Sequence, residues 1–384
     1  MKGFIAGILI LIPILASAQS DSSAKVTVRG YISGMQGSLY NNLAKDWQWD
    51  SYLTNRLNFK WYATKNLTAV AEMRNRVVTG DRMKAAPALY ATNFAHDYGW
   101  MDLNHNFIED SSYLLNTNVD RLYLAYQLDK LNITVGRQRI NWGQTLVWNP
   151  NDIFNAYSFF DFDYVERPGS DAVRVQYYNT ETSVIEAAVK MNRNNEVTAA
   201  GLYRFNKWGY DIQFLGGIFN SSDYVAGAGF SGNIKSIALR GEASYLHPKN
   251  NFADTSGLFL ASVEADHTFG NSLTVQCEYL FNQKPGINFN RFVSTYNTQM
   301  DVKSLSFVKH NLFAQVSYPI TPLLNGSLSG MVFPEYKGFY VGPSLTYSIA
   351  NNVDFAFIMQ AFSLEMNNQR IGMVMGFMRL KWNF

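Results

Sequence analysis

The spacing of polar and apolar residues is the feature that most constrains the fold of this chain. From about Lys25 to Phe384, stretches of roughly ten residues recur in which apolar and polar side chains alternate. Alternation with a period of two places one set of side chains on each face of a β-strand. The connections between these stretches alternate between very short and often long, as in an up-and-down barrel of an outer membrane. The sequence therefore predicts an all-β fold, a transmembrane antiparallel β-barrel.

Alternation and turn-forming residues together predict about 18 strands, within a range of 16–18. The predicted strands lie near 25–35, 51–63, 67–78, 118–128, 131–140, 168–178, 183–191, 196–205, 209–219, 223–232, 235–247, 257–269, 271–282, 306–318, 323–333, 338–349, 352–363 and 370–383. Long connections at 36–50, 79–117, 141–167 and 283–305 are predicted to face outside. The even strand number places both termini on the periplasmic side.

The start of the chain has the pattern of a secretory signal peptide. Lys2 supplies a charged start, residues 3–15 an apolar run, and Ala16-Ser17-Ala18 a small-residue cleavage site. The apolar run is short for a membrane helix and contains Pro13. We therefore predict a signal peptide at 1–18 and a barrel domain at 19–384, located in the Gram-negative outer membrane.

Composition and the last strand indicate the surroundings of this barrel. Aromatic residues make up 15% of the chain and charged residues only 16%, against about a quarter charged in soluble domains. Abundant aromatics fit the two girdles of a membrane barrel. Leu380, Trp382 and the terminal Phe384 share one face, which resembles the C-terminal signal of bacterial outer-membrane barrels.

These features predict the partners of the protein. They are outer-membrane lipid and lipopolysaccharide, small solutes, and the barrel-assembly machinery through the C-terminal strand. The net charge of +2 is too small to indicate a nucleic-acid partner. A homo-oligomer is left open.

Charged side chains on the strands are predicted to face the lumen, because Arg or Lys on the lipid face near the midplane costs about 2–4 kcal/mol. Barrels of 16–18 strands leave an aqueous channel. The predicted channel lining consists of Arg56, Arg74, Arg76, Arg121, Arg137, Arg139 and Arg174. Simple alternation would turn Arg137 and Arg139 into lipid. A β-bulge at Gly136 is predicted to turn them inward, and the alternative is that the strand ends there, above the membrane. Strands near 235–282 contribute mainly carboxylates, Glu242, Glu264 and Glu278 among them.

The segment after the sixth predicted strand is too apolar for a solvated loop. Its predicted functional residues are Trp142, Trp148, Asp152, Phe160, Asp161, Asp163 and Glu166. We interpret it as a constriction loop folded into the lumen, with its carboxylates opposite the arginine wall and its aromatics as a slide for solutes. Such opposed charges would set ion preference. The alternative is an outer loop whose aromatics pack against neighbouring loops.

A motif in this segment resembles poorly characterised porin-like families of Gram-negative outer membranes. It runs through Gly136-Arg137-Gln138, Trp142-Gly143, Trp148-Asn149-Pro150 and Asp152-Ile153-Phe154, then Glu166-Arg167-Pro168-Gly169 and Asp171-Ala172-Val173-Arg174. The resemblance implies an outer-membrane channel and carries no substrate with it.

The leading functional prediction is an outer-membrane porin, a passive diffusion channel for small polar or anionic solutes. The alternatives are a transporter of hydrophobic compounds and a non-conducting accessory barrel of a surface complex. The sequence has no P-loop, dinucleotide fingerprint or nucleophile elbow, so no enzyme is predicted. Carboxylates and histidines between His96 and Asp110 fit a solvated loop better than a metal site, and no cofactor or metal is predicted.

Overall fold

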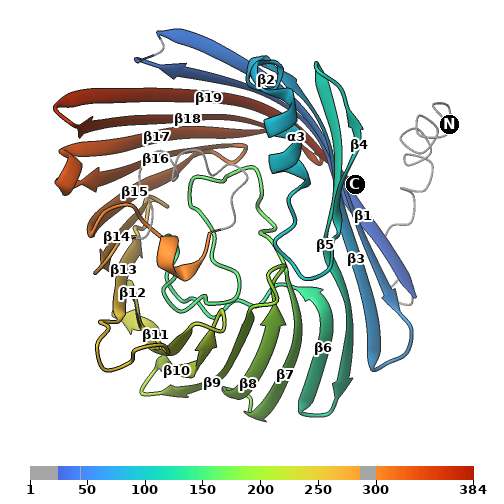
Figure 1. Cartoon of the computed structure of the whole chain (residues 1–384), viewed down its shortest axis with the longest axis vertical. Helices are drawn as coiled ribbons and strands as arrows, with labels where there is room; N and C mark the ends of the chain where they lie inside the picture. Colours follow the sequence, from blue (N-terminus) through green and yellow to red (C-terminus); the bar gives the residue numbers. More distant parts are fainter. Residues whose placement is uncertain (1–24, 44, 286–299) are drawn as a thin grey trace.

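The strands close into a barrel in the computed structural model, which describes residues 25–43, 45–285 and 300–384 (Figure 1). The strands are β1 (Val26–Asn41), β2 (Asp46–Tyr62), β3 (Leu67–Gly80), β4 (Asn104–Glu109), β5 (Tyr113–Leu128), β6 (Leu131–Gln138), β7 (Ser170–Thr180), β8 (Ser183–Met191), β9 (Val197–Lys207), β10 (Tyr210–Phe219), β11 (Asp223–Ile234), β12 (Ile237–Pro248), β13 (Leu258–Thr268), β14 (Thr274–Asn282), β15 (His310–Thr321), β16 (Leu324–Phe333), β17 (Gly338–Ala350), β18 (Val353–Met366) and β19 (Gln369–Asn383). The helices are α2 (Asp81–Ala85), α3 (Pro87–Ala95) and the short 3₁₀ turns η3 (Val302–Ser304) and η4 (Pro334–Tyr336). The predicted signal peptide lies outside the described residues.

The ring closes where the first strand meets the last. β1 pairs antiparallel with β19 from Tyr31–Asn383 to Asn41–Met373. Gly30 and Phe384 exchange two backbone hydrogen bonds of 2.9 Å. Within the described chain β4 pairs with β5 alone, so the closed ring contains 18 strands. The predicted fold and strand number are confirmed, and closure removes the free edges of the sheet.

One predicted long connection is largely strand. Residues 36–50 form the end of β1 and the start of β2, joined by a short turn after Asn41. Their alternating residues continue both ladders, so the predicted loop is wrong there. Connection 79–117 is long, as predicted, and contains α2, α3 and β4, none of which the sequence analysis predicted. Much of connection 283–305 lies outside the described residues.

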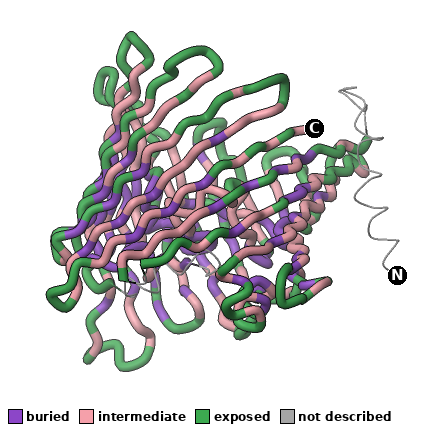
Figure 2. The backbone as a smooth tube through the Cα atoms, turned by 90° about the horizontal axis from the view of Figure 1, so that it is seen from above, coloured by how far each residue is buried: buried purple, intermediate pink, exposed green. Residues whose placement is uncertain are grey.

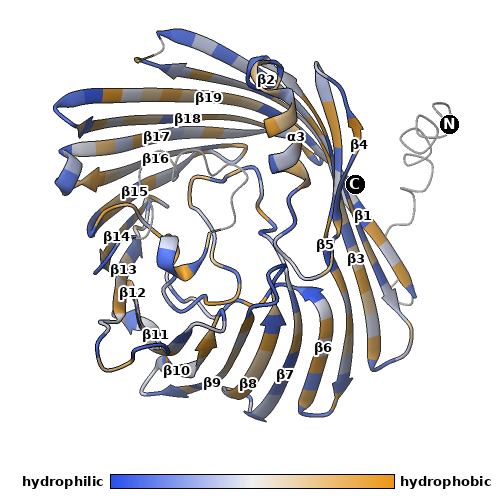
Figure 3. Ribbon diagram, in the orientation of Figure 1, coloured by the Kyte–Doolittle hydropathy of each residue, from blue (hydrophilic) through white to orange (hydrophobic). Residues whose placement is uncertain are grey.

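The outer face of the barrel is apolar. Leu53, Val135, Val263 and Leu328 are each about half exposed and point away from the lumen. Along the strands, buried or partly buried positions alternate with exposed ones (Figure 2), and apolar residues alternate with polar ones (Figure 3). An apolar outer band on a closed antiparallel sheet is the design of an outer-membrane β-barrel. No helix among the described residues is long and apolar enough to cross a membrane.

Two backbone irregularities turn charged side chains inward. Glu72 pairs with Arg121 and Met73 with Val119, so Asp120 is an extra residue in β5, and both Asp120 and Arg121 are buried. This is a β-bulge.

The bulge predicted at Gly136 is wrong as an insertion, because the ladders from β6 to β5 and to β7 show no shift of register there. Instead Gly136 has φ +118°, a conformation that L side chains rarely adopt. A Cβ at this position would lie 2.2 Å from the carbonyl oxygen of Leu122. The next residue, Arg137, is buried on the inner side.

The apolar outer face gives a direct prediction for Val263→Arg, a change on the outer side of β13. The free energy of unfolding should fall by about 2–4 kcal/mol, because a cation then enters hydrocarbon. Urea titration of protein refolded in phospholipid vesicles measures this, with Val263→Leu as the apolar control. Equal stability of the Arg variant and the control would show that this face does not contact lipid.

Candidate channel constriction

A segment without regular secondary structure, residues 139–169, connects β6 to β7 and lies within the ring of strands (Figure 1). We call it the inserted segment. Its side chains and backbone contact inner-face residues far apart around the ring, including Glu186 on β8, Glu278 on β14 and Gln360 on β18. The barrel wall therefore holds this segment from several sides.

Two buried glutamates of the wall hold the backbone of the inserted segment. Glu278 accepts hydrogen bonds from the backbone N–H groups of Val147 and Trp148, both at 2.8 Å. Glu242 on β12 accepts from the N–H of Gln144 at 2.9 Å and from the hydroxyl of Thr145 at 3.0 Å. Backbone N–H groups buried away from water need an acceptor, and a carboxylate is a strong one. We call Glu242 and Glu278 the carboxylate clamp.

The tryptophans of the inserted segment are buried within it. Trp142 is 0% exposed, packs on Phe154 at 4.8 Å between ring centroids, and donates from Nε1 to Glu186 at 2.6 Å. Trp148 is 4% exposed and meets Phe313 edge to face. Neither ring presents a face to a passing solute, so the interpretation of these two residues as a slide is wrong. Phe160 is partly buried and packs against Tyr340 and Phe362.

Arginines on β2, β3 and β5 hold the other part of the inserted segment. Arg56 is fully buried and donates to both carboxylate oxygens of Asp120, at 2.7 and 3.1 Å, and to Glu72 at 2.6 Å. Its Nε lies 3.6 Å from Glu166 of the inserted segment. Arg121 donates to the carbonyl oxygens of Glu166 and Arg167 at 2.5 and 2.9 Å.

Asp163 lies in the same region and bridges two strands. It accepts a hydrogen bond from Arg74 on β3 and lies 3.7 Å from Arg379 on β19. The guanidinium of Arg74 also lies 4.9 Å from the ring centre of Tyr164. The predicted carboxylates Asp163 and Glu166 are therefore in contact with the arginines and not across a channel from them. In these pairs the opposite charges compensate each other locally.

Two further predicted arginines are paired with wall and loop carboxylates. Arg137 is 3% exposed and donates to Asp97 and Asp171, with shortest contacts of 2.7 Å to each. Arg174 donates twice to Glu186, at 2.6 and 2.8 Å. Both arginines thus anchor structure around the inserted segment.

The last two predicted lining residues, Arg76 and Arg139, are only partly buried. Arg76 stacks on Phe94 at 4.5 Å and donates to Asn116. Arg139 lies 5.8 Å from the ring centre of Tyr157. Among the described residues neither forms an ion pair within 4.0 Å, and their lining of a channel stays a prediction.

Asp152 and Asp161 are bonded within the inserted segment itself. Asp161 accepts from the backbone N–H of Tyr164 at 3.3 Å. Asp152 is fully buried, accepts from the N–H of Asn155 at 3.2 Å, and its Oδ2 has no partner in the described chain. Burial raises the pKa of Asp152 to about 6, although donation from the Asn155 N–H opposes the shift.

Sequence reasoning did not identify the partners that make this arrangement. Asp97, Asp120 and Asp171 each face an arginine, and the clamp glutamates were predicted only as part of an acidic wall. The sequence signal available for these partners was only that a carboxylate lies on the inner face of a strand. It could not show which backbone group the carboxylate would meet. Asp97 pairs with Arg137, and no cluster of metal-ligating side chains occurs among residues 25–43, 45–285 and 300–384.

The fold and the inserted segment define the class of this protein as an outer-membrane β-barrel with a partly filled lumen. Its fold is similar to that of OccK11 (OpdR) of Pseudomonas aeruginosa, with a TM-score of 0.57 at 8% identity over 94% of this chain and 96% of that one. The fold is also similar to that of OccAB3 of Acinetobacter baumannii, with a TM-score of 0.57 at 10% identity over 93% of this chain and 99% of that one. The outer membrane protein OpdK of Pseudomonas aeruginosa has a TM-score of 0.54 at 7% identity, over 93% of this chain and 98% of that one. No protein-family profile and no curated protein sequence matches the chain.

The carboxylate clamp predicts the effect of Glu278→Ala. Two backbone donors, at Val147 and Trp148, would lose their acceptor, and each hydrogen bond to a charged group contributes about 1.5–3 kcal/mol. Amide hydrogen exchange at residues 144–148 should therefore accelerate while the strands stay protected. Glu365→Ala, which removes an exposed surface ion pair with Lys337, is the control. Unchanged protection of residues 144–148 would show that the clamp does not hold the segment.

The raised pKa of Asp152 predicts a pH dependence. Because the folded-state pKa lies above the ordinary value, the folded protein binds this proton more tightly than the unfolded chain does. Its contribution to stability is therefore complete below about pH 4 and is lost as the pH rises through about 6. The free energy of unfolding, measured across this pH range, should fall with rising pH in the wild type. It should change less in Asp152→Asn, whose amide imitates the protonated acid. Identical slopes would rule out Asp152 as the source.

Proposed function

We propose that this protein is an outer-membrane porin, a passive diffusion channel for small polar or anionic solutes. The observation that carries the proposal is the charge left unpaired inside the closed ring. Around the inserted segment, Arg56, Arg74, Arg137 and Arg174 are held in ion pairs with carboxylates. Arg29, Lys60 and Lys381 lie apart from this network, at the end of the barrel that carries the described termini.

These three cations face the lumen and have no ion-pair partner within 4.0 Å in the described chain. Arg29 lies on the same strand face as the buried Tyr31 and Ser33, and Lys381 stacks over the Tyr31 ring at 4.2 Å. Lys60 lies on the face of β2 that carries Arg56. Charged side chains of one sign along a pore set its ion preference, and positively charged side chains favour the passage of anions. This arrangement supports anion preference at the mouth of the barrel.

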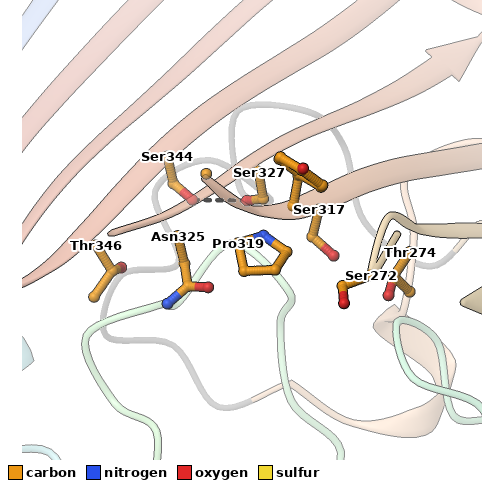
Figure 4. A pocket seen from close by; sticks show the side chains of 10 residues that line it. Ser272, Thr274, Ser317, Pro319, Asn325, Ser327, Ser344 and Thr346 are labelled. Atoms are coloured by element: carbon orange, nitrogen blue, oxygen red, sulfur yellow. Dashed lines mark hydrogen bonds between the residues drawn. The ribbon is translucent and has the colours of Figure 1, made fainter. Parts of the chain in front are cut away.

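A second part of the inner wall at this end is uncharged and polar. Side chains from β14 to β17 line a pocket there (Figure 4), among them Thr274, Ser317, Ser327, Ser344 and Thr346. Ser327 and Ser344 are joined by a hydrogen bond of 2.7 Å. Hydroxyl groups both donate and accept, so this wall can exchange hydrogen bonds with water or a polar solute. It supports passage of polar compounds rather than fatty ones.

The non-conducting accessory barrel is the second candidate, because one observation favours it. Buried apolar residues of the inserted segment, such as Ile140 and Phe154, belong to a continuous cluster with inner-face residues of β8–β19. A cluster of this extent fills part of the lumen. Recording from folded protein separates the two candidates, since the porin must conduct.

The proposal predicts the effect of the double reversal Arg29→Glu/Lys60→Glu. In a planar bilayer under a salt gradient, the wild type should give a reversal potential that favours anions, and the variant one shifted toward cations. Lys337→Glu, at an exposed position beside Glu365 at the other end of the barrel, is the matched control and should keep the wild-type value. Open channels with the same selectivity in all three proteins would exclude anion selection by these residues.

A further inference from the structure

The outer face of β1, β2, β3 and β5 contains a group of polar side chains. On β2, Asp50, Thr54 and Arg56 are buried on the inner side, whereas Leu53 and Phe59 point outward and are exposed. Alternation along the four strands then places on the outer side Gln36, Ser38, Ser51, Asn55, Asn75 and Thr117. We call these six residues the polar patch. At corresponding outer positions elsewhere the chain has apolar residues such as Val135, Val263 and Leu328.

The polar patch lies within the apolar band and not at its edge. On β2 the outward residues run from Trp49 through Asn55 to Phe59, so Asn55 is near the middle of a span bounded by aromatic residues. Such residues mark the membrane interfaces of a barrel. Asn55 is also level with Asn75 in the β2–β3 ladder, and Asn75 with Thr117 in the β3–β5 ladder.

The side chains of the patch are hydrogen-bonded to one another. Thr117 donates to Asn75 at 2.7 Å, and Asn75 donates to Asn55 at 3.3 Å. Ser51 donates to Gln36 at 2.6 Å. Asn55 is only 4% exposed and donates to the carbonyl oxygen of Tyr31, and the amide of Gln36 donates to the carbonyl oxygens of Gly37 and Asp50. Asn75 uses one of its two amide N–H groups in the described bonds. Hydrogen-bonding capacity therefore remains at a depth where lipid tails offer no partner.

We propose that the polar patch is the contact surface between copies of this chain, arranged around an axis normal to the membrane. Copies inserted in one membrane share the same orientation, so equal faces at equal depth can meet around such an axis. Asn, Gln, Ser and Thr both donate and accept hydrogen bonds, which makes this surface complementary to itself. None of the six residues is charged, so the patch offers no cation to the phosphates of lipopolysaccharide.

Cross-linking through single cysteines tests the contact, and the native chain supplies the control. Cys277 is exposed and faces outward on β14, on the other side of the ring from β2 (Figure 1). The variant Ser51→Cys/Cys277→Ser carries the thiol on the patch instead. In lipid vesicles with a bifunctional thiol-reactive cross-linker, this variant should form covalent dimers and the wild type should stay single. Folded Ser51→Cys/Cys277→Ser that stays single, or dimers formed through Cys277 in the wild type alone, would overturn the proposal.

The mass of the protein in lipid nanodiscs gives a second test. The wild type should have the mass of a multimer, and Asn55→Leu/Asn75→Leu should shift toward the monomer, whereas the conservative Thr117→Ser should keep the multimer. Heat-modifiable mobility in gel electrophoresis shows that each variant is folded. A folded wild type that is monomeric would refute the contact, and this includes the case in which a different protein covers the patch. Neither test depends on conductance, so the porin proposal can fail independently.

Discussion

The arrangement inside the barrel depends on satisfying the backbone of the inserted segment where water is scarce. A segment without strands or helices leaves its N–H groups unpaired, and burying them costs free energy unless an acceptor is supplied. The wall supplies acceptors at fixed positions, because Glu242 on β12 and Glu278 on β14 stand on strands that both pair with β13, and the sheet sets their register. With the backbone of the segment fixed by Glu242 and Glu278, the buried side chains of Trp142 and Trp148 pack against Phe154 and Phe313.

Ion pairing between arginines and carboxylates then determines which charged side chains of the lumen remain to interact with passing ions. Arg56, Arg74 and Arg137 lie inside the lumen wall but are held by carboxylates, and their charge is compensated locally. The number of arginines on the inner face alone therefore does not predict the ion selectivity of a channel. Among the cations without an ion-pair partner in the described chain, Lys60 lies toward the mouth that carries the termini. In the proposed function, the inserted segment and the cations that would select ions are thus separate parts of the same interior.

The sequence predicted the barrel and all of its wall strands, because alternation and short turns are local signals that survive without any tertiary information. It did not predict β4 or the helices of connection 79–117, whose residues lack a sustained period. Inward placement of Arg137 was predicted through a bulge, while the structure uses the unusual φ of Gly136. Residue types in the inserted segment indicated burial, but the partner of each arginine depends on contacts between strands far apart in the chain, as Arg74 and Asp163 show.

The central claim is that the inserted segment, held by the wall, sets the width of the channel. Single-channel conductance of the wild type beside a variant in which a short Gly-Ser linker replaces residues 143–165 tests it most directly. The account predicts small discrete steps from the wild type and several-fold larger steps from the variant, both from demonstrably folded protein. Equal conductance in the two proteins would contradict the claim, since the segment would then lie outside the conducting path.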